Sequence, residues 1–578
     1  MAKNVMKMLK PSPKRGKNAF DLSHRHVLGA KFGELLPITC LETVPGDYFE
    51  VNCADLLRAM PMVTSPFLRA KQHIDFWFVP YTDLWHQFNS FITMKSQPQS
   101  SALQDADFVP HVNIVDIQTA FDDAYADGLT DIHGIAYTVG AKKLFDLLGY
   151  GKYNVTAGTG QNMPDVNVWR IAAYNYIWYN EYRQQYYDVG DRLLDNNNQN
   201  ASYLFNFDDL LCDAYANADL YDGTTTSEQR IQAMFQMRYR CWKKDLYTGL
   251  MPSTQFGNVS AVDVSLPSEL ILSNKASSAS VGGKYAFAGP NSSVLGIDDG
   301  TGQFVSSSAV WVPKLSNASV SSNFDILAFR RSQAVQIWRE NALRSGNRIN
   351  DNMRGHYGEI PSYQRDHRPT YIGSYDAVLN ISDVNATAQT GTGGNQALGD
   401  VAGKGLSSLD SKKLKFQCND FGVIMGIFSV LPEAEYNSDG IERANQLLDR
   451  YDYFSPEMEN LGLEAVSSLN FMTSVRENAR VIGYAPRYYG YKTKLDKCFG
   501  EFTTGGSLQI WCSPKYDVRV AVSNNYAAIA LSTLYVNPNI FNVNFVSDVD
   551  VIGEQVLCDF FFNVEAVRPM TVLGLPTV

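Results

Sequence analysis

The chain reads Ile74-Asp75-Phe76-Trp77-Phe78-Val79-Pro80 over one short stretch, and this stretch indicates the fold class. Aromatic and β-branched residues favour extended strands, and a proline ends them because it cannot donate a ladder hydrogen bond. Residues 35–44 have a similar character, and the turn signal Pro45-Gly46-Asp47 separates them from the strand-like residues 48–51. Together these residues predict two antiparallel strands with a long excursion between them.

Strand signals return in the C-terminal part of the chain. They cover residues 421–431, 508–512, 517–522, 527–536, 543–552 and 556–567. In Val518-Arg519-Val520 apolar and polar residues alternate, which indicates a strand with one buried face. Strands at both ends of the chain, with helical and loop-rich segments between them, predict a mainly β protein, an antiparallel sandwich with large insertions.

Two segments carry the helical period instead. Over residues 168–187 apolar and aromatic side chains recur at helical spacing, which favours a packing helix over a platform for stacked bases. A second helix is predicted to begin after the N-cap Asn323 and to end near Gly346. Its arginines form either a solvated face or a contact with a subunit or with DNA. The apolar side consists of Ile326, Leu327, Ala334, Ile337, Trp338 and Leu343, and the opposite side of Arg330, Arg331, Arg339 and Arg344.

Two segments have the composition of long loops. Residues 273–322 contain 13 serines and 6 glycines but only 5 charged residues. Short apolar pieces are embedded in this segment, so we expect a folded surface protrusion rather than a disordered linker. A second loop, rich in glycine and threonine, is predicted over residues 386–405.

The charge of the chain is unevenly distributed. Residues 1–31 carry eight lysines and arginines against the single acid Asp21, a net charge of +7, so the total of -11 leaves -18 on residues 32–578. A protein that coats nucleic acid would carry positive charge over its folded surface. A basic arm (residues 1–31) on an acidic body (residues 32–578) therefore predicts one local contact with a polyanion.

The eight cysteines are scattered, with no CxxC pair and no short spacing to histidine. This pattern is typical of reduced, mostly buried thiols in a protein made in a cytoplasm. The basic residues near the N-terminus are not followed by an apolar run, and no apolar stretch reaches the roughly 18 residues that a membrane span needs. We therefore expect neither export nor membrane insertion.

No motif for catalysis or metal binding rises above background. Residues 399–405 resemble a phosphate-binding loop, but their spacing is one residue short and glycine replaces the required Ser or Thr. Residues 123–134 begin like a calcium loop, but Tyr125 and a missing terminal Glu break the pattern. The histidines form no cluster with cysteine or carboxylate. The sequence predicts a structural protein with no catalytic residues, metal ion or cofactor.

Two other classes of protein share some of these features. A carbohydrate-binding β-sandwich would have the aromatic residues and the Ser/Gly-rich loops, but it would normally carry an export signal. A glycoside hydrolase on a β scaffold would need two carboxylates that face each other across a groove, and the sequence cannot place such a pair.

Several stretches, taken in order along the chain, resemble the major capsid proteins of the Microviridae, and most closely those of the gokushovirus-like and Bacteroides-associated small single-stranded DNA phages. The resemblance extends from the arm to the last ten residues, and it fades over residues 190–236 and 258–322. The stretches are Phe20-Asp21-Leu22-Ser23-His24, residues 41–47, residues 76–80 with Trp85, residues 484–491, and residues 559–562 through Arg568-Pro569-Met570.

The resemblance implies an eight-stranded antiparallel jelly roll with long helical and loop insertions. It also implies that sixty copies, through pentamers, close into a T=1 icosahedral shell around circular single-stranded DNA. The protein would be assembled in the bacterial cytoplasm and found in the virion, with minor virion proteins and in some relatives a small basic DNA-binding peptide. By position, residues 258–322 would form a protrusion at the threefold axis that contacts the host surface.

The basic arm has a simple role in this setting, because its cations could neutralise phosphates inside the shell in a salt-sensitive and sequence-independent way. The alternative is that the arm only ties neighbouring subunits together. The predicted nucleic-acid-binding residues are Lys3, Lys7, Lys10, Lys14, Arg15 and Lys17.

Overall fold

The computed structural model describes most of the folded body of the chain. The described residues are 16–85, 88–93, 109–152, 165–188, 227–255, 297–298, 304–305, 326–345, 349–358, 368–385, 401–410, 412–470, 481–512, 520–523, 526–529, 531–546 and 553–572. The chain divides into two compact units, of which the second comprises residues 255–360 and the first comprises the rest.

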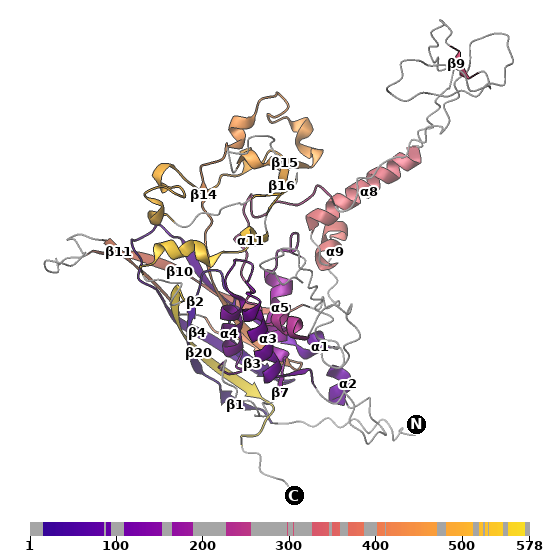
Figure 1. Cartoon of the computed structure of the whole chain (residues 1–578). Helices are drawn as coiled ribbons and strands as arrows, with labels where there is room; N and C mark the ends of the chain where they lie inside the picture. Colours follow the sequence, from indigo (N-terminus) through magenta and orange to yellow (C-terminus); the bar gives the residue numbers. More distant parts are fainter. Residues whose placement is uncertain are drawn as a thin grey trace, which may run out of the picture. The chain divides into compact units, whose positions relative to one another are not determined.

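One large antiparallel sheet dominates the first unit (Figure 1). Its order is β1-β20-β4-β11-β10-β5-β13-β3, and β2 and β12 pair in addition with β20 and β4. The sheet has two halves, joined by β10, which pairs with β11 in one half and with β5 in the other. The strands are β1 (Asn18–Asp21), β2 (His24–Ala30), β3 (Leu36–Thr43), β4 (Tyr48–Ala59), β5 (Ala70–Pro80), β10 (Thr370–Asn385), β11 (Val401–Asp410), β12 (Leu414–Gln417), β13 (Gly422–Pro432) and β20 (Val556–Arg568).

The sheet curls so that its two halves enclose the core. The Phe560 ring of β20 lies 4.9 Å from the Phe428 ring of β13, and the Phe562 ring lies 6.5 Å from the Phe76 ring of β5, between ring centroids. Buried and accessible residues alternate regularly along β20, because successive side chains of a strand point to opposite faces. β20 and β4 therefore turn one face to the core and the other outward.

The other half of the sheet is covered on both faces. Nearly every residue of β13 is buried, because one face of this half packs against β20 and its other face packs against the helices α1 (Tyr81–Leu84), α4 (Tyr137–Leu147) and α5 (Trp169–Ile177). We call β3, β13, β5 and β10 the covered half, and β1, β2, β20, β4, β11 and β12 the open half.

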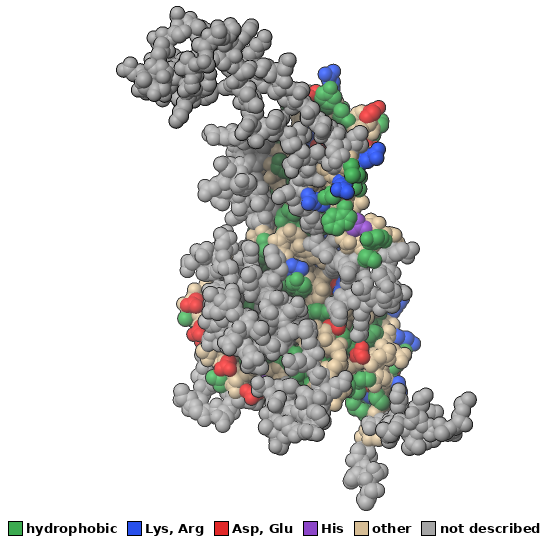
Figure 2. All heavy atoms as spheres, turned by 90° about the vertical axis from the view of Figure 1, so that its right-hand side faces the viewer, with side chains coloured by type: hydrophobic (Ala, Val, Ile, Leu, Met, Phe, Trp, Pro, Cys, Tyr) green, Lys and Arg blue, Asp and Glu red, His purple; other side chains and the backbone are tan. Residues whose placement is uncertain are grey.

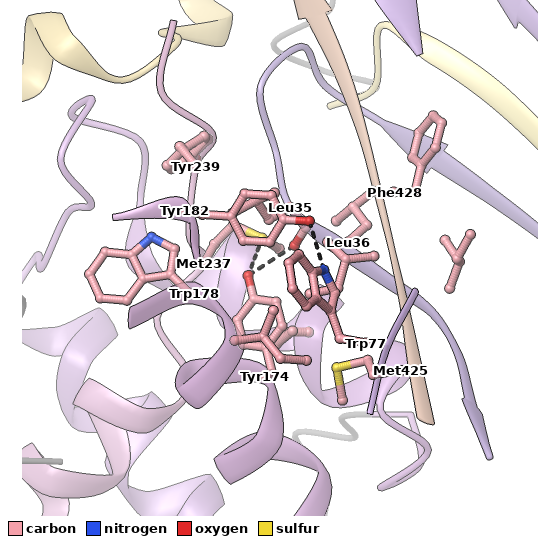
Figure 3. Packing of buried hydrophobic residues seen from close by; sticks show 14 of the residues in the cluster. Leu35, Leu36, Trp77, Tyr174, Trp178, Tyr182, Met237, Tyr239, Met425 and Phe428 are labelled. Carbon is pink, nitrogen blue, oxygen red and sulfur yellow. Dashed lines mark hydrogen bonds between the residues drawn. The ribbon is translucent and has the colours of Figure 1, made fainter. Parts of the chain in front are cut away.

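Every residue of helix α5 except Arg170 is buried, and most of its side chains are apolar, which is typical of a core helix. Figure 3 shows its Tyr174 and the following π-helical turn η3 (Trp178–Tyr182) against β5. The Tyr174 hydroxyl donates to the backbone oxygen of Leu35 (2.9 Å), and the Trp77 indole N–H donates to the Tyr182 hydroxyl (3.2 Å). The interpretation of residues 168–187 as a packing helix is confirmed, since these buried rings cannot stack on bases.

The remaining elements of the first unit are short. They are α2 (Phe88–Thr93), β6 (His111–Asn113), α3 (Ile114–Ala126), β7 (Asp165–Asn167), α7 (Ser227–Met234), β14 (Tyr436–Asn437), η5 (Arg443–Gln446), η6 (Pro456–Leu461), β15 (Leu463–Ser467), η7 (Ser468–Asn470), β16 (Val481–Pro486), α10 (Tyr489–Lys492), β17 (Lys497–Cys498), η8 (Gly500–Phe502), η9 (Gln509–Trp511), β18 (Val520–Ser523), β19 (Tyr526–Ile529), α11 (Leu531–Leu534) and η10 (Pro538–Asn544).

The second unit contains two helices and a short hairpin among its described residues. These are α8 (Ile326–Ser345), α9 (Ile349–Tyr357), β8 (Ile297–Asp298) and β9 (Phe304–Val305). Helix α8 confirms the predicted second helix, although Asn323 lies outside the described residues. Most of the predicted protrusion over residues 258–322 also lies outside them.

The strand predictions are confirmed where a strand lies inside the sheet. Residues 35–44, 74–79, 421–431 and 556–567 correspond to β3, β5, β13 and β20. The prediction of two antiparallel strands with a long excursion between them is wrong, because residues 35–80 contain three strands that do not pair with one another. β3 and β5 both pair with β13, while β4 pairs with β20, β11 and β12. A turn between two strands does not show whether they pair with each other or with distant strands.

Three of the C-terminal predictions are wrong in whole or in part. Residues 508–512 contain the 3-10 helix η9, residues 527–536 contain the end of β19 followed by α11, and residues 543–544 end η10. Residues 513–519 and 547–552 lie outside the described residues.

The second loop prediction also needs correction, because residues 401–405 belong to β11 and pair with β10. A paired strand has its backbone N–H groups engaged in the ladder and cannot wrap around a phosphate. The part of the predicted loop before Val401 lies outside the described residues.

Candidate interaction surfaces

Lys17 places the start of the basic arm on the sheet. Its ammonium group donates to the backbone oxygen of Gly46 at 2.6 Å. The next residue, Asn18, pairs with Arg568 at the end of β20, and its side chain donates to the backbone oxygen of Met570 at 2.7 Å. Lys3, Lys7, Lys10, Lys14 and Arg15 lie outside the described residues. The arm therefore joins the body at the edge of the open half.

An exposed ion pair joins β2 and β20 on the open half. The Arg25 guanidinium on β2 donates two hydrogen bonds of 2.7 Å to the Asp559 carboxylate on β20. These bonds lower the pKa of Asp559 below its usual value. Because both groups are exposed, the pair contributes little to stability, but it fixes the direction of two charges on the outer face.

The outer face of the open half, which we call the open face, is apolar toward one end. Val27, Leu557 and Phe561 are exposed by 69%, 48% and 51%, and Leu406 of β11 is also exposed. The register places them in neighbouring rows, since Leu557 and Leu406 both pair with Arg58 of β4. Exposed apolar side chains on adjacent strands that are rimmed by charges are typical of a surface that binds another molecule.

The other end of the open face carries charges of both signs. Asp21, Glu565 and Glu50 occupy one cross-strand row of β1, β20 and β4. Lys413 and Lys415 bind the Glu50 carboxylate at 3.4 and 3.3 Å and lower its pKa. This row lies three residues along β20 from Arg568, where the arm begins.

The sequence of β20 contains a signal for the open face. Residues 556–567 alternate with the period of a strand, so Leu557 and Phe561 fall on the face opposite Val556 and Phe560. A strand with one solvent-exposed face normally has polar residues on that face. The apolar residues on that face therefore point to a contact surface.

A second exposed surface lies in the segment between β14 and β17. Leu448 is exposed by 91%, and several large side chains around it are about half exposed. Interfaces between proteins are enriched in Tyr, Phe and Arg, which combine large apolar area with polar ends. This aromatic loop surface consists of Leu448, Tyr451, Tyr453, Phe454, Leu461 and Tyr491.

Hydrogen bonds and a ring contact hold the aromatic loop surface in place. The Asp452 carboxylate accepts hydrogen bonds from the backbone N–H groups of Leu448 (3.1 Å) and Asp449 (3.0 Å), which lower its pKa. The Tyr488 ring packs edge to face on Phe454 at 5.2 Å, although its φ of 61° is unusual for a residue with a side chain. A rigid surface loses little conformational entropy when it binds a partner.

Helix α8 in the second unit is mostly exposed. Leu327, Ile337 and Trp338 are each more than half exposed, while Leu343 is buried. The predicted arginine side is also largely accessible, and Figure 2 shows basic and hydrophobic side chains next to one another in this part of the chain. Both interpretations of the arginines, solvated face and contact surface, remain compatible with this exposure.

The part of the chain that the structure describes contains no group of three or more His, Cys, Asp or Glu side chains that could hold a metal ion. None of the helices within the described ranges has both the length and the apolar character that crossing a bilayer requires. The seven cysteines in the same ranges are free thiols, and four of them are buried.

Comparison with known proteins assigns the chain to a family. The family model described as capsid protein (F protein) matches residues 11–578. The capsid protein VP1 of Chlamydia phage 1 is 23% identical, over 97% of this chain and 95% of its own length. The capsid protein VP1 of Bdellovibrio phage phiMH2K is 24% identical, over 46% of this chain and 48% of its own. Because the family model covers nearly the whole chain, the protein belongs to the capsid protein (F protein) family of the Microviridae.

Proposed function

We propose that sixty copies of this chain, arranged as pentamers, close into a T=1 icosahedral shell around circular single-stranded DNA. The observation that carries the proposal is the family match over residues 11–578. The protein acts in the virion as a structural subunit without catalytic activity, after assembly in the bacterial cytoplasm. Its further partners are minor virion proteins, among them in some phages a small basic DNA-binding peptide.

The sheet of the first unit is an eight-stranded jelly roll in this proposal. Here β11 and β12 count as one strand, and β1 counts as an addition at the edge. The open half then consists of β2, β20, β4 and β11, which are the first, eighth, third and sixth strands along the chain. The covered half consists of β3, β13, β5 and β10, which are the second, seventh, fourth and fifth strands. This order supports the assignment, because two Greek keys that are wrapped together produce it.

The aromatic loop surface and α8 serve as contacts between copies. A closed shell needs several different interfaces on each subunit, and both surfaces combine exposed rings with arginines.

Electron microscopy of the purified full-length chain tests the assembly. We expect uniform spherical shells or pentamers, and a reconstruction with icosahedral symmetry would show sixty jelly rolls in the wall. The matched variant Leu448→Asp puts a charge on the aromatic loop surface and should leave free subunits that are still folded. A wild-type chain that stays monomeric and is absent from every particle would contradict the proposal.

The arm binds the genome. Six of its eight cations, those of residues 1–17, neutralise phosphates, so replacing these six by Gln should reduce both the packaged DNA and the salt dependence of DNA binding. The residues are Lys3, Lys7, Lys10, Lys14, Arg15 and Lys17.

DNA content per shell, measured by absorbance, and binding of single-stranded DNA at several salt concentrations check this prediction. The control variant Lys243→Gln with Lys244→Gln removes two exposed cations of the body and should package DNA normally. Normal packaging by a chain that lacks residues 1–17 would refute the role of the arm.

Residues 258–322 form the protrusion at the threefold axis and contact the host surface. Their composition and their position inside the second unit support this assignment. Deletion of this segment should abolish adsorption of assembled particles to the host, and adsorption that is unchanged would reject the assignment.

A further inference from the structure

Two free thiols of the first unit lie next to each other. Cys498 is buried on β17, and Cys512 directly follows η9 and is partly exposed. A hydrogen bond links the two thiols. Neighbouring thiols can be joined by a disulfide bond with little movement of the backbone, because the two sulfur atoms need only approach to about 2 Å.

The segment before β5 holds the residues next to Cys512. The backbone N–H of Phe67 donates to the backbone oxygen of Trp511 at 2.8 Å, and the rings of these two residues lie 6.5 Å apart. The Thr64 hydroxyl donates to the backbone oxygen of Ile510 at 3.4 Å. These contacts fix the end of η9 and, with it, the backbone that carries Cys512.

The same segment holds the surroundings of Cys498. The Arg69 guanidinium binds the carboxylates of Asp496 at 2.7 Å and Glu435 at 3.4 Å. Asp496 is two residues before Cys498, and the Cys498 thiol donates to the Glu435 carboxylate at 3.5 Å. Phe67 and Arg69 are two residues apart, a span of at most about 7 Å. One short segment therefore positions both cysteines.

We propose that Cys498 and Cys512 form a disulfide bond when the protein meets a small-molecule disulfide outside a reducing cytoplasm. The bond closes a ring of 15 residues and joins β17 to the end of η9. The timing of this step rests on the proposed function, since a cytoplasm keeps thiols reduced and release of the particle exposes them to oxidants. The bond therefore follows assembly and locks residues 499–511 in place.

The surroundings of the two thiols set the order of the reaction. Burial and the charge of Glu435 raise the pKa of Cys498 to about 12, so this thiol stays protonated at neutral pH and does not attack first. Cys512 is partly exposed and meets the oxidant. Its thiolate attacks one sulfur of the small disulfide, which releases the first small thiol and leaves a mixed disulfide on Cys512.

Cys498 completes the reaction. Its sulfur attacks the Cys512 sulfur and displaces the second small thiol, while the proton of Cys498 passes through the Glu435 carboxylate to the departing thiolate. Two protein thiols are oxidised and one small disulfide is reduced. The products are one protein disulfide and two small thiols, so atoms and electrons balance.

Oxidised glutathione and the purified full-length chain test the reaction. After alkylation of the remaining thiols and peptide mapping, we expect a reducible bond between Cys498 and Cys512 within one chain. In Cys498→Ser, glutathione should stay on Cys512, because the second thiol is missing. In Cys512→Ser, Cys498 should acquire at least about tenfold less glutathione, because it is buried and protonated.

Cys241→Ser is the matched control. The Cys241 thiol donates to the backbone oxygen of Tyr182 at 3.2 Å, so its removal should leave the rate of bond formation unchanged. A bond that joins two chains, or the lack of any bond between Cys498 and Cys512, would reject the inference. Equal amounts of glutathione on the two single variants would reject the order of attack.

Hydrogen exchange measures what the bond does. Amides of residues 499–511 should exchange at least about fivefold more slowly in the oxidised than in the reduced wild-type chain, because the cross-link restricts opening of the ring. The double variant Cys498→Ser with Cys512→Ser should exchange like the reduced chain under both conditions. Equal exchange in the oxidised and reduced wild type would reject the locking role.

Particles separate this inference from the proposed function. Cys498 and Cys512 should be free in particles alkylated inside the host cell and joined in particles released into the medium. A chain that forms the bond but never assembles would reject the proposed function alone. Particles whose two thiols stay free after treatment with oxidised glutathione would reject the disulfide.

Discussion

Replacing Phe560 by alanine should destabilise the folded chain by about 3–5 kcal/mol, the usual cost of removing a fully buried phenylalanine. Phe560 is completely buried and contacts Phe428 across the core, so its removal leaves a cavity between the two halves of the sheet. Chemical denaturation of the unassembled full-length chain, followed by tryptophan fluorescence, measures the loss.

The neighbouring residue provides a matched control. Phe561 follows Phe560 on the same strand but points to the open face, so Phe561→Ala should change the stability of the body by less than about 1 kcal/mol. Similar losses for both variants would contradict the assignment of inward and outward faces along β20.

Replacing Asp55 by asparagine should stabilise the chain at neutral pH. Asp55 of β4 is buried and accepts hydrogen bonds from the Gln72 amide of β5 at 3.1 and 3.0 Å. Burial raises its pKa to about 6, against an ordinary value of 3.8. The neutral asparagine side chain removes the buried charge, and its own amide could donate to the Gln72 Oε1 atom, which has no donor within the described ranges.

The pH dependence gives the size of this effect. The folded state holds the Asp55 proton more tightly than the unfolded state, so the cost of the charge appears as pH rises from about 3.8 to about 6 and is full above that range. A difference in pKa of this size corresponds to about 3 kcal/mol. The free energy of unfolding of Asp55→Asn should therefore exceed that of the wild type by about 2–3 kcal/mol at pH 7.5 and by almost nothing at pH 3.5.

Denaturation midpoints at several pH values check this prediction. Asp383→Asn, on an exposed position of β10, removes the same charge and should leave the midpoint nearly unchanged. A wild-type chain whose stability rises with pH from 4 to 6 as much as that of Asp55→Asn would show that Asp55 is not the group responsible. Because Asp55 and Phe560 are cross-strand neighbours, their two effects should not add in a double variant.

The sequence predicted the strands that carry the core and missed the helical turns near the C-terminus. The sequence predicted β5, β13 and β20 because long runs of aromatic and β-branched residues strongly favour strands. Residues 527–536 are apolar too, but Leu534, Tyr535 and Val536 are buried at the end of a helical turn. A short apolar run does not distinguish a buried strand from a buried helical turn.

One of these errors was avoidable. Asn537 and Pro538 form a helix-start signal, in which the Asn537 side chain accepts a hydrogen bond from the N–H of Asn539 and the proline takes the first helical position. This signal would have predicted η10 in place of a strand beginning at residue 543.

The interaction surfaces could be predicted only in part. Charge alone identified the arm, and the structure adds the position of Lys17 at the end of β20. The open face depends on which strands are neighbours, and pairings such as that of β2 with β20 join residues more than 500 positions apart. Local sequence patterns carry no information on contacts of that range.

The pairing of Asn18 with Arg568 has a practical consequence for labelling this protein. The chain enters and leaves the sheet at the same place, since Asn18 also binds the backbone of Met570. A peptide tag inserted directly before Asn18 or directly after Met570 would therefore start from one common point on the subunit. Antibody access to the two tags in intact particles should agree, and either tag alone would report which side of the wall this end of the sheet faces.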